Sequence, residues 1–326
     1  MQIGAEGTAS MDETPKGKLS FVSHFYMPSI QLQVKTSLIS FPSSATIVSE
    51  PLGLVLVISA WNFPFVELLL WSICLITTLS LDPVVGAIAA GNAVVLKPSE
   101  SAPDTSSLLA KLVEKYMDTS AVKVVEGAVA LTTALLHQKW DKIFYTGGSE
   151  VGHIVLTCVA THLTPVVLEL GGKCPAVLDS NINLKVAVRR IIAGKWGCNN
   201  GQACISPDYI ITTKDFLLDD AQVSGKIVCG GERDILNIKI APTLILDVSR
   251  DSVVMDEEIF DPILPILTVD KIEESFGVIN GKEKPLAAYL FTNDKKLEEK
   301  FVRNISAGGI IINDTILHFL EPGLPL

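Results

Sequence analysis

The chain has 326 residues, of which 48% are hydrophobic, and its formal net charge is -10. This length predicts about two domains, and the apolar content is ample for a buried core. The acidic balance argues against nucleic acid as a partner, because phosphate binding needs clustered lysine and arginine side chains.

Cysteine usage and the N-terminus indicate the compartment. The six cysteines are irregularly spaced, with no Cys-x-x-Cys pair, and the five histidines are scattered. We therefore expect reduced core cysteines, Cys204 excepted, and no metal site. Residues 1–20 are polar and show no cleavable signal, so the chain is predicted to be cytoplasmic.

The first half of the chain alternates between two kinds of pattern. Residues 1–34 carry no periodicity, and four short apolar runs typical of buried parallel strands follow, at 54–58, 93–96, 121–125 and 142–145. We expect helices over 83–90 and 104–117, the second capped by Ser101 or Asp104. Strands alternating with helices indicate a parallel sheet, which binds nucleotides beyond the carboxyl ends of its strands.

One stretch stands out by its hydropathy. Between Leu52 and Leu81 the only charged residue is Glu67, and residues 68–76 are almost wholly apolar. A hydropathy window would flag a membrane span here. Asn62 and Glu67 interrupt the stretch, so we do not favour membrane contact through 52–81. It stays an alternative, under which the protein would be membrane-associated.

In the second half, a helix is expected over 184–197 and a strand over 209–212. Two short motifs frame this region. Glu169 opens Glu-Leu-Gly-Gly-Lys, and Cys204 closes Gly-Gln-Ala-Cys. A cysteine nucleophile needs a base or an electropositive site to form its thiolate, and a nearby glutamate can also activate the water that releases the product.

These motifs resemble those of the aldehyde dehydrogenase family, especially class 3 and its plant members, in the family order and over roughly residues 35–323. The matching segments are 51–53, 60–65, 90–100, 144–152, 168–173, 201–204, 257–260 and 308–314. The resemblance implies an α/β fold, with a Rossmann-type doubly wound parallel sheet plus a second α/β catalytic domain. It implies a dinucleotide-binding domain over 35–168 and a catalytic domain over 169–326, after an unmatched segment 1–34.

The resemblance also indicates where this chain departs from the family. It implies truncation at both ends, an insertion near 66–78 and a deletion near 219–222. An alternative to an active enzyme is therefore a catalytically inactive remnant, or a splice or gene-model variant, that binds nucleotide or a related subunit.

The implied activity is NAD(P)-dependent oxidation of an aldehyde to a carboxylic acid. Cys204 would be the nucleophile that forms a thiohemiacetal and then a thioester. Asn62 would stabilise the oxyanion together with the Cys204 backbone N–H. Glu169 would be the general base, with a pKa raised by its apolar flanks.

The resemblance assigns the cofactor residues in the same way. Lys97 and Glu100 would bind the adenosine ribose, and the glutamate favours NAD, with NADP as an alternative. Gly147 and Gly152 would let the backbone approach the pyrophosphate at a helix N-terminus. Glu258 and Phe260 would hold the nicotinamide half, and the preferred aldehydes would be medium- or long-chain.

Three further positions carry expectations. Gly148 stands where relatives have Ser or Asn, so a polar contact is expected to be lost. Asp261 stands where the family has glycine, which predicts strain in its loop. Asn313 is expected to brace the Cys204 loop. A homodimer is the assembly expected of the family.

Overall fold

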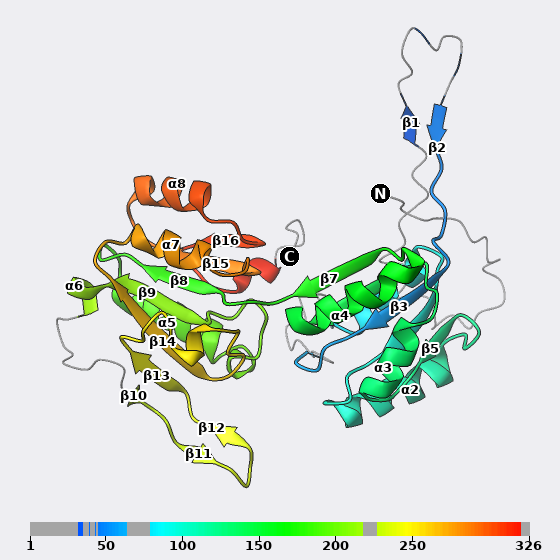
Figure 1. The fold of residues 1–326 in the computed structure, drawn as a ribbon, viewed down its shortest axis with the longest axis horizontal. Helices are drawn as coiled ribbons and strands as arrows, with labels where there is room; N and C mark the ends of the chain where they lie inside the picture. The colour runs from blue at the N-terminus through cyan, green and yellow to red at the C-terminus, as the bar shows by residue number, and fades with distance from the viewer. Residues whose placement is uncertain are drawn as a thin grey trace. The chain divides into compact units, whose positions relative to one another are not determined.

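The computed structural model describes residues 32–34, 39, 43, 45–63, 79–217 and 227–320. The chain forms two compact units, Met1–Glu169 and Leu170–Leu326 (Figure 1). The insertion expected near 66–78 and the deletion expected near 219–222 lie outside the described residues.

The first unit is built on a five-stranded sheet. Its strands are β3 (Leu54–Ile58), β4 (Ala93–Lys97), β5 (Val122–Val124), β6 (Lys142–Gly147) and β7 (Val166–Leu170). They lie in the order β5-β4-β3-β6-β7, and β3 runs parallel to both β4 and β6. The strand order reverses between β3 and β6, which confirms the predicted doubly wound sheet and places its switch point between these two strands.

Four helices accompany this sheet: α1 (Leu81–Ala89), α2 (Pro103–Tyr116), α3 (Val129–Leu136) and α4 (Ser149–Val159) (Figure 1). The predicted cap of α2 was wrong. The N-cap is Ala102, without a side-chain hydrogen bond, and Pro103 follows as the first helical residue. Proline suits that position because its fixed φ is already helical, so the helix begins there whichever polar residue lies nearby.

Two features lie at the edges of the described part of the first unit. β1 (Leu32–Val34) and β2 (Ala45–Ile47) form a separate antiparallel ribbon. The residues that flank the expected insertion meet, because the Leu79 N–H donates to the Phe63 carbonyl at 3.3 Å.

The second unit is built on a seven-stranded sheet. The strands are β8 (Pro175–Leu178), β9 (Tyr209–Thr213), β10 (Ile227–Cys229), β13 (Thr243–Leu246), β14 (Ile263–Val269), β15 (Ala287–Phe291) and β16 (Gly309–Ile312). Their order is β10-β13-β14-β9-β8-β15-β16. Edge strand β10 pairs antiparallel with β13, and the other neighbours run parallel. This is the second α/β domain that the resemblance implied.

Its helices are α5 (Leu184–Lys195), α6 (Lys214–Leu217), α7 (Glu274–Asn280) and α8 (Lys295–Asn304). Alternate strand residues face opposite sides of a sheet, and both sides are buried here. Val177 and Ile211 belong to one apolar cluster, whereas Ala176 and Ile210 belong to another. This explains why the strands were recognisable as continuous apolar runs.

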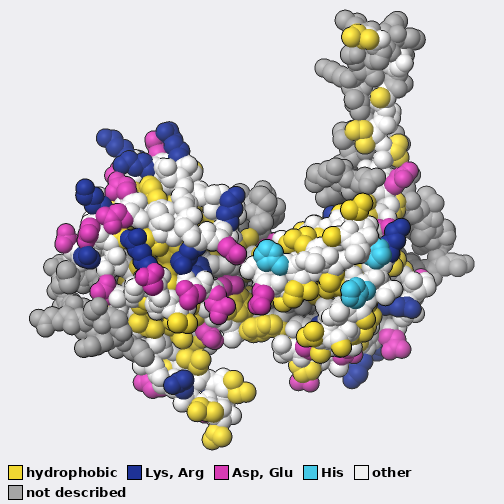
Figure 2. Space-filling view, in the orientation of Figure 1, with side chains coloured by type: hydrophobic (Ala, Val, Ile, Leu, Met, Phe, Trp, Pro, Cys, Tyr) yellow, Lys and Arg dark blue, Asp and Glu magenta, His cyan; other side chains and the backbone are white. Residues whose placement is uncertain are grey.

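A small hairpin projects from the second unit. β11 (Arg233–Asp234) pairs with β12 (Lys239–Ile240), and the turn between them exposes Ile235, Leu236 and Ile238 by 87%, 94% and 92% (Figure 2). Asp234 holds the turn by accepting from the Asn237 N–H at 3.0 Å.

Among the described residues, no helix is long and apolar enough to span a membrane. Residues 64–78, which make up about half of the stretch in which membrane contact was considered, lie outside them.

Candidate active site

The loop that carries Cys204 is shaped by left-handed backbone. α5 ends at Lys195, and the short 3-10 turn Asn199–Gly201 follows. Asn199, Asn200 and Gly201 have φ angles of 53°, 54° and 86°. A Cβ on Gly201 would lie 2.5 Å from the Asp261 carbonyl oxygen and 3.0 Å from the Lys195 ammonium nitrogen. Only glycine satisfies both the dihedral and the close approach.

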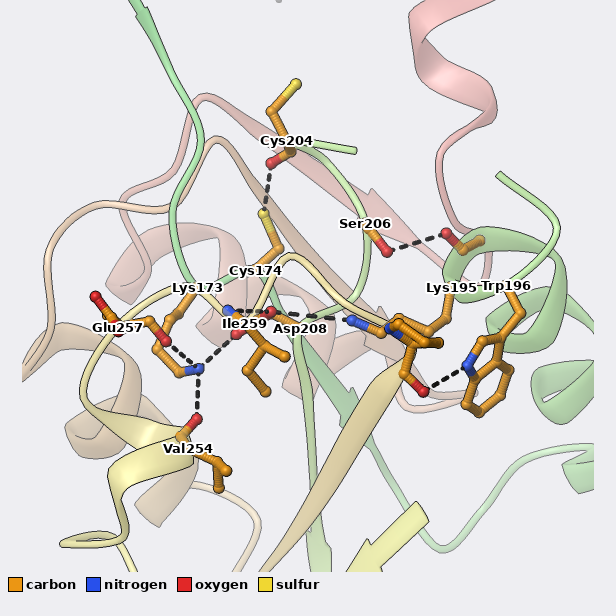
Figure 3. A network of polar contacts seen from close by, with 12 residues as sticks. Lys173, Cys174, Lys195, Trp196, Cys204, Ser206, Asp208, Val254, Glu257 and Ile259 are labelled. Atoms are coloured by element: carbon orange, nitrogen blue, oxygen red, sulfur yellow. Dashed lines mark hydrogen bonds and ion pairs between the residues drawn. The ribbon is translucent and has the colours of Figure 1, made fainter. Parts of the chain in front are cut away.

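Cys204 itself is half-buried, and its backbone is held from below. The Cys174 thiol donates to the Cys204 carbonyl at 3.3 Å, and the Tyr289 hydroxyl donates to the Ile205 carbonyl. The Ser206 N–H closes a turn onto the Ala203 carbonyl at 2.8 Å. In Figure 3 the Cys204 sulfur points away from its contact with Cys174, so the thiol lies on the opposite side of the backbone.

Beneath this loop lies a buried cluster of charges. Lys173 and Asp208 form an ion pair of 2.5 Å, and both side chains are at most 5% exposed (Figure 3). The Lys195 ammonium nitrogen lies 3.9 Å from the second Asp208 oxygen. Lys195 is fully buried, and its nitrogen has no hydrogen-bond partner among the described residues. Burial lowers the pKa of Lys195, although the nearby Asp208 opposes this effect.

Glu258 faces the Gly171–Gly172 backbone. It accepts a hydrogen bond from the Gly172 N–H, and a Cβ on Gly171 would lie 2.5 Å from its carboxylate. Burial raises the pKa of Glu258 to about 7. The carboxylate therefore changes its charge in the neutral range.

Strain was expected at Asp261, but the left-handed backbone conformation in this loop is found one residue earlier. Phe260 has a φ of 53°, whereas Asp261 is not among the left-handed residues. The side chain at 261 is therefore tolerated, because the turn in this loop is made by its neighbour. Burial raises the pKa of Asp261, and the Lys195 charge opposes that shift.

Two predicted catalytic residues lie in the first unit. Asn62 follows β3 and is 8% exposed, and Glu169 lies in β7 and is half-buried. Burial raises the pKa of Glu169, in the direction that its apolar flanks predicted. Ser59 and Ser80 share a buried hydrogen bond of 2.8 Å beside the strand that leads to Asn62.

The predicted nucleotide-binding residues gather at one edge of the first sheet. Lys97 ends β4, and its ammonium group is paired with the Glu100 carboxylate. That pairing lowers the pKa of Glu100. Gly147 ends β6, and Gly152 lies in the first turns of α4. Parallel strands place these positions at the carboxyl edge of the sheet, next to its switch point.

The same edge fits a dinucleotide. The N-cap of α4 is Gly148, which provides no side-chain cap, and a Cβ there would meet nothing within 4 Å. The backbone N–H groups of the helix end are therefore accessible to an anion. The buried Thr146 hydroxyl oxygen also has no hydrogen-bond partner in the described part of the chain.

Asn313 was expected to brace the Cys204 loop. Its side-chain amide pairs with the Thr292 backbone at 2.8 and 2.9 Å, and its carbonyl accepts from Arg190. These residues lie at the carboxyl end of β15 and β16, where Asn313 also lines a cavity of about 210 Å³ with Phe291 and Asn293. These contacts tie Asn313 to α5 and to the end of β15, and its support of the Cys204 loop stays a prediction.

The prediction of core cysteines was wrong for part of the set. Cys174 is buried, and burial raises its pKa well above the ordinary value. Burial also raises the pKa of the half-buried Cys198. Cys229, however, is exposed, because it lies on edge strand β10. Edge strands leave one side uncovered.

Three functional candidates received no prediction from the sequence: Lys173, Lys195 and Asp208. A signal for two of them was present. Lys195 is the last residue of α5 and is spaced to share the buried face of Ile191, and Asp208 immediately precedes the buried strand β9. A charged residue between apolar segments is costly to bury and is usually paired or functional.

Within each unit, the predicted residues assemble at one edge of a sheet. Cys204, Glu258 and Phe260 lie in loops of the second unit that Lys173 and Asp208 connect. At the carboxyl edge of the first sheet, Lys97 and Gly147 end their strands, and Asn62 and Glu100 follow theirs.

Comparison with known proteins identifies the family to which this arrangement belongs. The model of the aldehyde dehydrogenase family matches residues 20–220 and 212–324. An aldehyde dehydrogenase of Craterostigma plantagineum is 60% identical over 90% of this chain and 67% of its own length. Aldehyde dehydrogenase family 3 member H1 of Arabidopsis thaliana is 56% identical over 90% of this chain and 66% of its own length. The chain thus spans about two thirds of these relatives.

Solved structures give the same result. The substrate-bound aldehyde dehydrogenase AldH of Staphylococcus aureus superposes with a TM-score of 0.82 at 34% identity, covering 93% of this chain and 71% of that one. The aldehyde dehydrogenase of Mycobacterium tuberculosis, solved with NAD+, gives a TM-score of 0.73 at 25% identity, covering 88% and 66%. The chain belongs to the aldehyde dehydrogenase family of NAD(P)-dependent oxidoreductases, and its Arabidopsis relative is named a family 3 member.

Proposed function

We propose that this chain oxidises an aldehyde to a carboxylic acid with NAD, or with NADP as the alternative. Residues 35–168 would form the dinucleotide-binding domain and residues 169–326 the catalytic domain. The single observation that carries the proposal is the half-buried Cys204 thiol, which points away from the Cys174 thiol that holds the Cys204 backbone. A partly exposed thiol on a fixed loop can act as a nucleophile once it is deprotonated.

The cofactor would lie at the carboxyl edge of the first sheet. Lys97 and Glu100 would bind the adenosine ribose. Gly147, Gly152 and the open end of α4 would receive the pyrophosphate. Glu258 and Phe260 would hold the nicotinamide half, and the bound nicotinamide supplies the acceptor for the hydride.

The first chemical step belongs to Cys204. Its thiolate attacks the aldehyde carbonyl carbon, and the carbonyl π electrons move to the oxygen. The Asn62 amide and the Cys204 backbone N–H would stabilise that oxyanion, and loss of one such donor typically costs about 100- to 1000-fold in rate. When the oxyanion collapses, the hydride leaves the carbon and a thioester to Cys204 remains.

The second step belongs to Glu169. Its carboxylate would take a proton from water as the water oxygen attacks the thioester. The sulfur then leaves as the thiolate and the carboxylic acid is released. Burial holds the pKa of Glu169 above its ordinary value, which makes the carboxylate a stronger base once it is ionised.

The substrate class is proposed from the apolar cluster against which Cys204 packs. Ile316, Phe319 and Trp196 pack against the same buried cluster as Cys204. These side chains support medium- or long-chain aldehydes as substrates. We also propose that the protein forms a homodimer and is located in the cytoplasm. One plant relative, which is 55% identical, is named chloroplastic.

The test is NADH formation by the full chain with a medium-chain aldehyde and NAD. We expect turnover by the wild type, none by Cys204→Ala, and full activity in Cys229→Ala, whose thiol is exposed on β10. Equal activity in Cys204→Ala would contradict the assignment of the nucleophile. NAD binding without turnover by folded wild-type protein would favour the inactive, nucleotide-binding alternative.

A further inference from the structure

We propose that Lys173 and Asp208 are positioning residues that hold the Glu258–Phe260 segment in register with the Cys204 loop. The contacts of Lys173 and Asp208 with that segment can be tested whether or not the protein is an active enzyme. The consequence for cofactor binding rests on the proposed function.

Lys173 anchors the segment that leads to Glu258. Its ammonium nitrogen donates to the Val254 carbonyl at 2.9 Å and to the Glu257 carbonyl at 2.8 Å. The third donor goes to Asp208 at 2.5 Å. An ammonium group has three donors, so every one of them is used, and two fix the backbone on the approach to Glu258.

Asp208 anchors the same segment from its other end. One carboxylate oxygen accepts from Lys173, and the other accepts from the Ile259 N–H at 3.1 Å. Ile259 lies between Glu258 and Phe260. The two side chains therefore hold residues 254–259 at three backbone positions (Figure 3).

Asp208 also belongs to the nucleophile segment. It follows Cys204 by four residues, and its N–H donates to the Cys174 carbonyl at 2.8 Å. The Cys174 thiol in turn donates to the Cys204 carbonyl. One buried carboxylate thus connects the loop of the thiol to the loop of Glu258, with Lys195 at 3.9 Å as a second cation.

A purely stabilising function would be a poor explanation of this cluster. Desolvation makes buried ion pairs weak contributors to stability, and the Lys195 nitrogen lacks a hydrogen bond in the described residues. The cluster provides directional contacts, because it makes three hydrogen bonds to backbone groups, and apolar side chains could not make them. Preorganisation of this kind is how a site holds its groups in place.

Lys173→Met is the informative variant. It removes the bonds to Val254 and Glu257 and leaves Asp208 with Lys195 as its remaining cation. Lys214→Met is the matched control, because Lys214 forms an exposed ion pair of 2.8 Å with Asp270 in the same unit. Lys173→Gln, which keeps a donor amide, replaces the methionine variant if that protein does not fold.

The first measurement is hydrogen exchange of the full chain, compared between residues 254–260 and the rest of the second unit. We expect exchange in 254–260 to accelerate about 10-fold or more in Lys173→Met, and about 3-fold or more in Lys173→Gln. Lys214→Met should leave this segment unchanged. The second measurement is KM for NAD, expected to rise about 10-fold while kcat changes less.

Unchanged exchange in 254–260, or an increase spread evenly over the unit in proportion to the loss of Tm, would overturn the inference. Both outcomes would leave the cluster with a structural role only. If the wild type forms no NADH, the proposed function fails, while the exchange comparison still decides whether Lys173 positions the segment.

Discussion

The Leu79 N–H donates to the Phe63 carbonyl at 3.3 Å, although residues 64–78 lie between them in the chain. The buried hydrogen bond between Ser59 and Ser80 lies just beyond this closure. The two flanks of the expected insertion therefore meet at a backbone hydrogen bond. Asn62 immediately precedes the closed point.

This closure predicts that residues 66–78 can be removed. Deleting them should change Tm by only a few degrees, because a hydrogen bond already joins the flanks and a shorter connection between two joined points has a small entropic effect. Thermal unfolding and NADH formation by the deletion variant check this. Loss of the fold would show that the removed residues supply core contacts, and loss of activity alone would show that they position Asn62.

Glu258 should make stability depend on pH. Burial raises its pKa to about 7 from 4.5, so the folded protein binds the proton more tightly than the unfolded chain. This contribution is full below about pH 4.5 and is lost as pH rises through about 7, and it is at most about 3 kcal/mol. Tm of the wild type should fall over this window relative to that of Glu258→Gln. Parallel Tm curves for the two proteins would contradict the shift.

Gly201 should be intolerant of a side chain. Alanine there would combine a φ of 86° with a Cβ 2.5 Å from the Asp261 carbonyl oxygen. We expect Gly201→Ala to lower the free energy of unfolding by about 2–4 kcal/mol. Gly148→Ala is the control, since its Cβ meets nothing within 4 Å and its φ is -73°. Denaturant unfolding of both variants measures the difference, and equal stabilities would refute the packing argument.

Glu169→Gln should stop the reaction after the first step. Without the base, the thioester persists, and kcat should fall about 100- to 10,000-fold. A rapid burst of NADH, close to one per active site, should remain in stopped-flow measurements. Glu299→Gln, at an exposed glutamate of α8, is the control and should turn over normally. Steady turnover without a burst in Glu169→Gln would assign the base to another group.

For the wild type, the raised pKa of Glu169 gives the same step a pH dependence. Deacylation needs the carboxylate, so kcat should increase as pH rises through that pKa. The increase should be absent from the burst amplitude, because the first step does not use this group. A kcat independent of pH in the acidic range would contradict it.

The sequence predicted those parts of the fold that depend on short-range patterns. The runs at 54–58 and 93–96 are β3 and β4, because strands of a parallel sheet are buried on both faces and therefore continuously apolar. The strand–glycine–helix context of Gly147 was recognisable for the same reason, and the structure has β6 ending there and α4 following.

Long-range contacts could not be predicted in this way. Lys173 lies 81 residues from Val254, and nothing local shows that these two positions meet. Asn313 was expected at the Cys204 loop, and the pairing of its amide with Thr292 across two adjacent strands was not predicted. The left-handed turn at Phe260 was also missed, because such a residue adopts it only under the constraint of its surroundings.

The hairpin of β11 and β12 exposes an apolar tip. Asp234 holds the turn through Asn237, and Ile235, Leu236 and Ile238 are almost fully exposed. Exposed apolar tips of this kind promote self-association. We therefore expect Leu236→Lys to raise the concentration that the purified chain tolerates, without altering the described core, because Leu236 is not part of it.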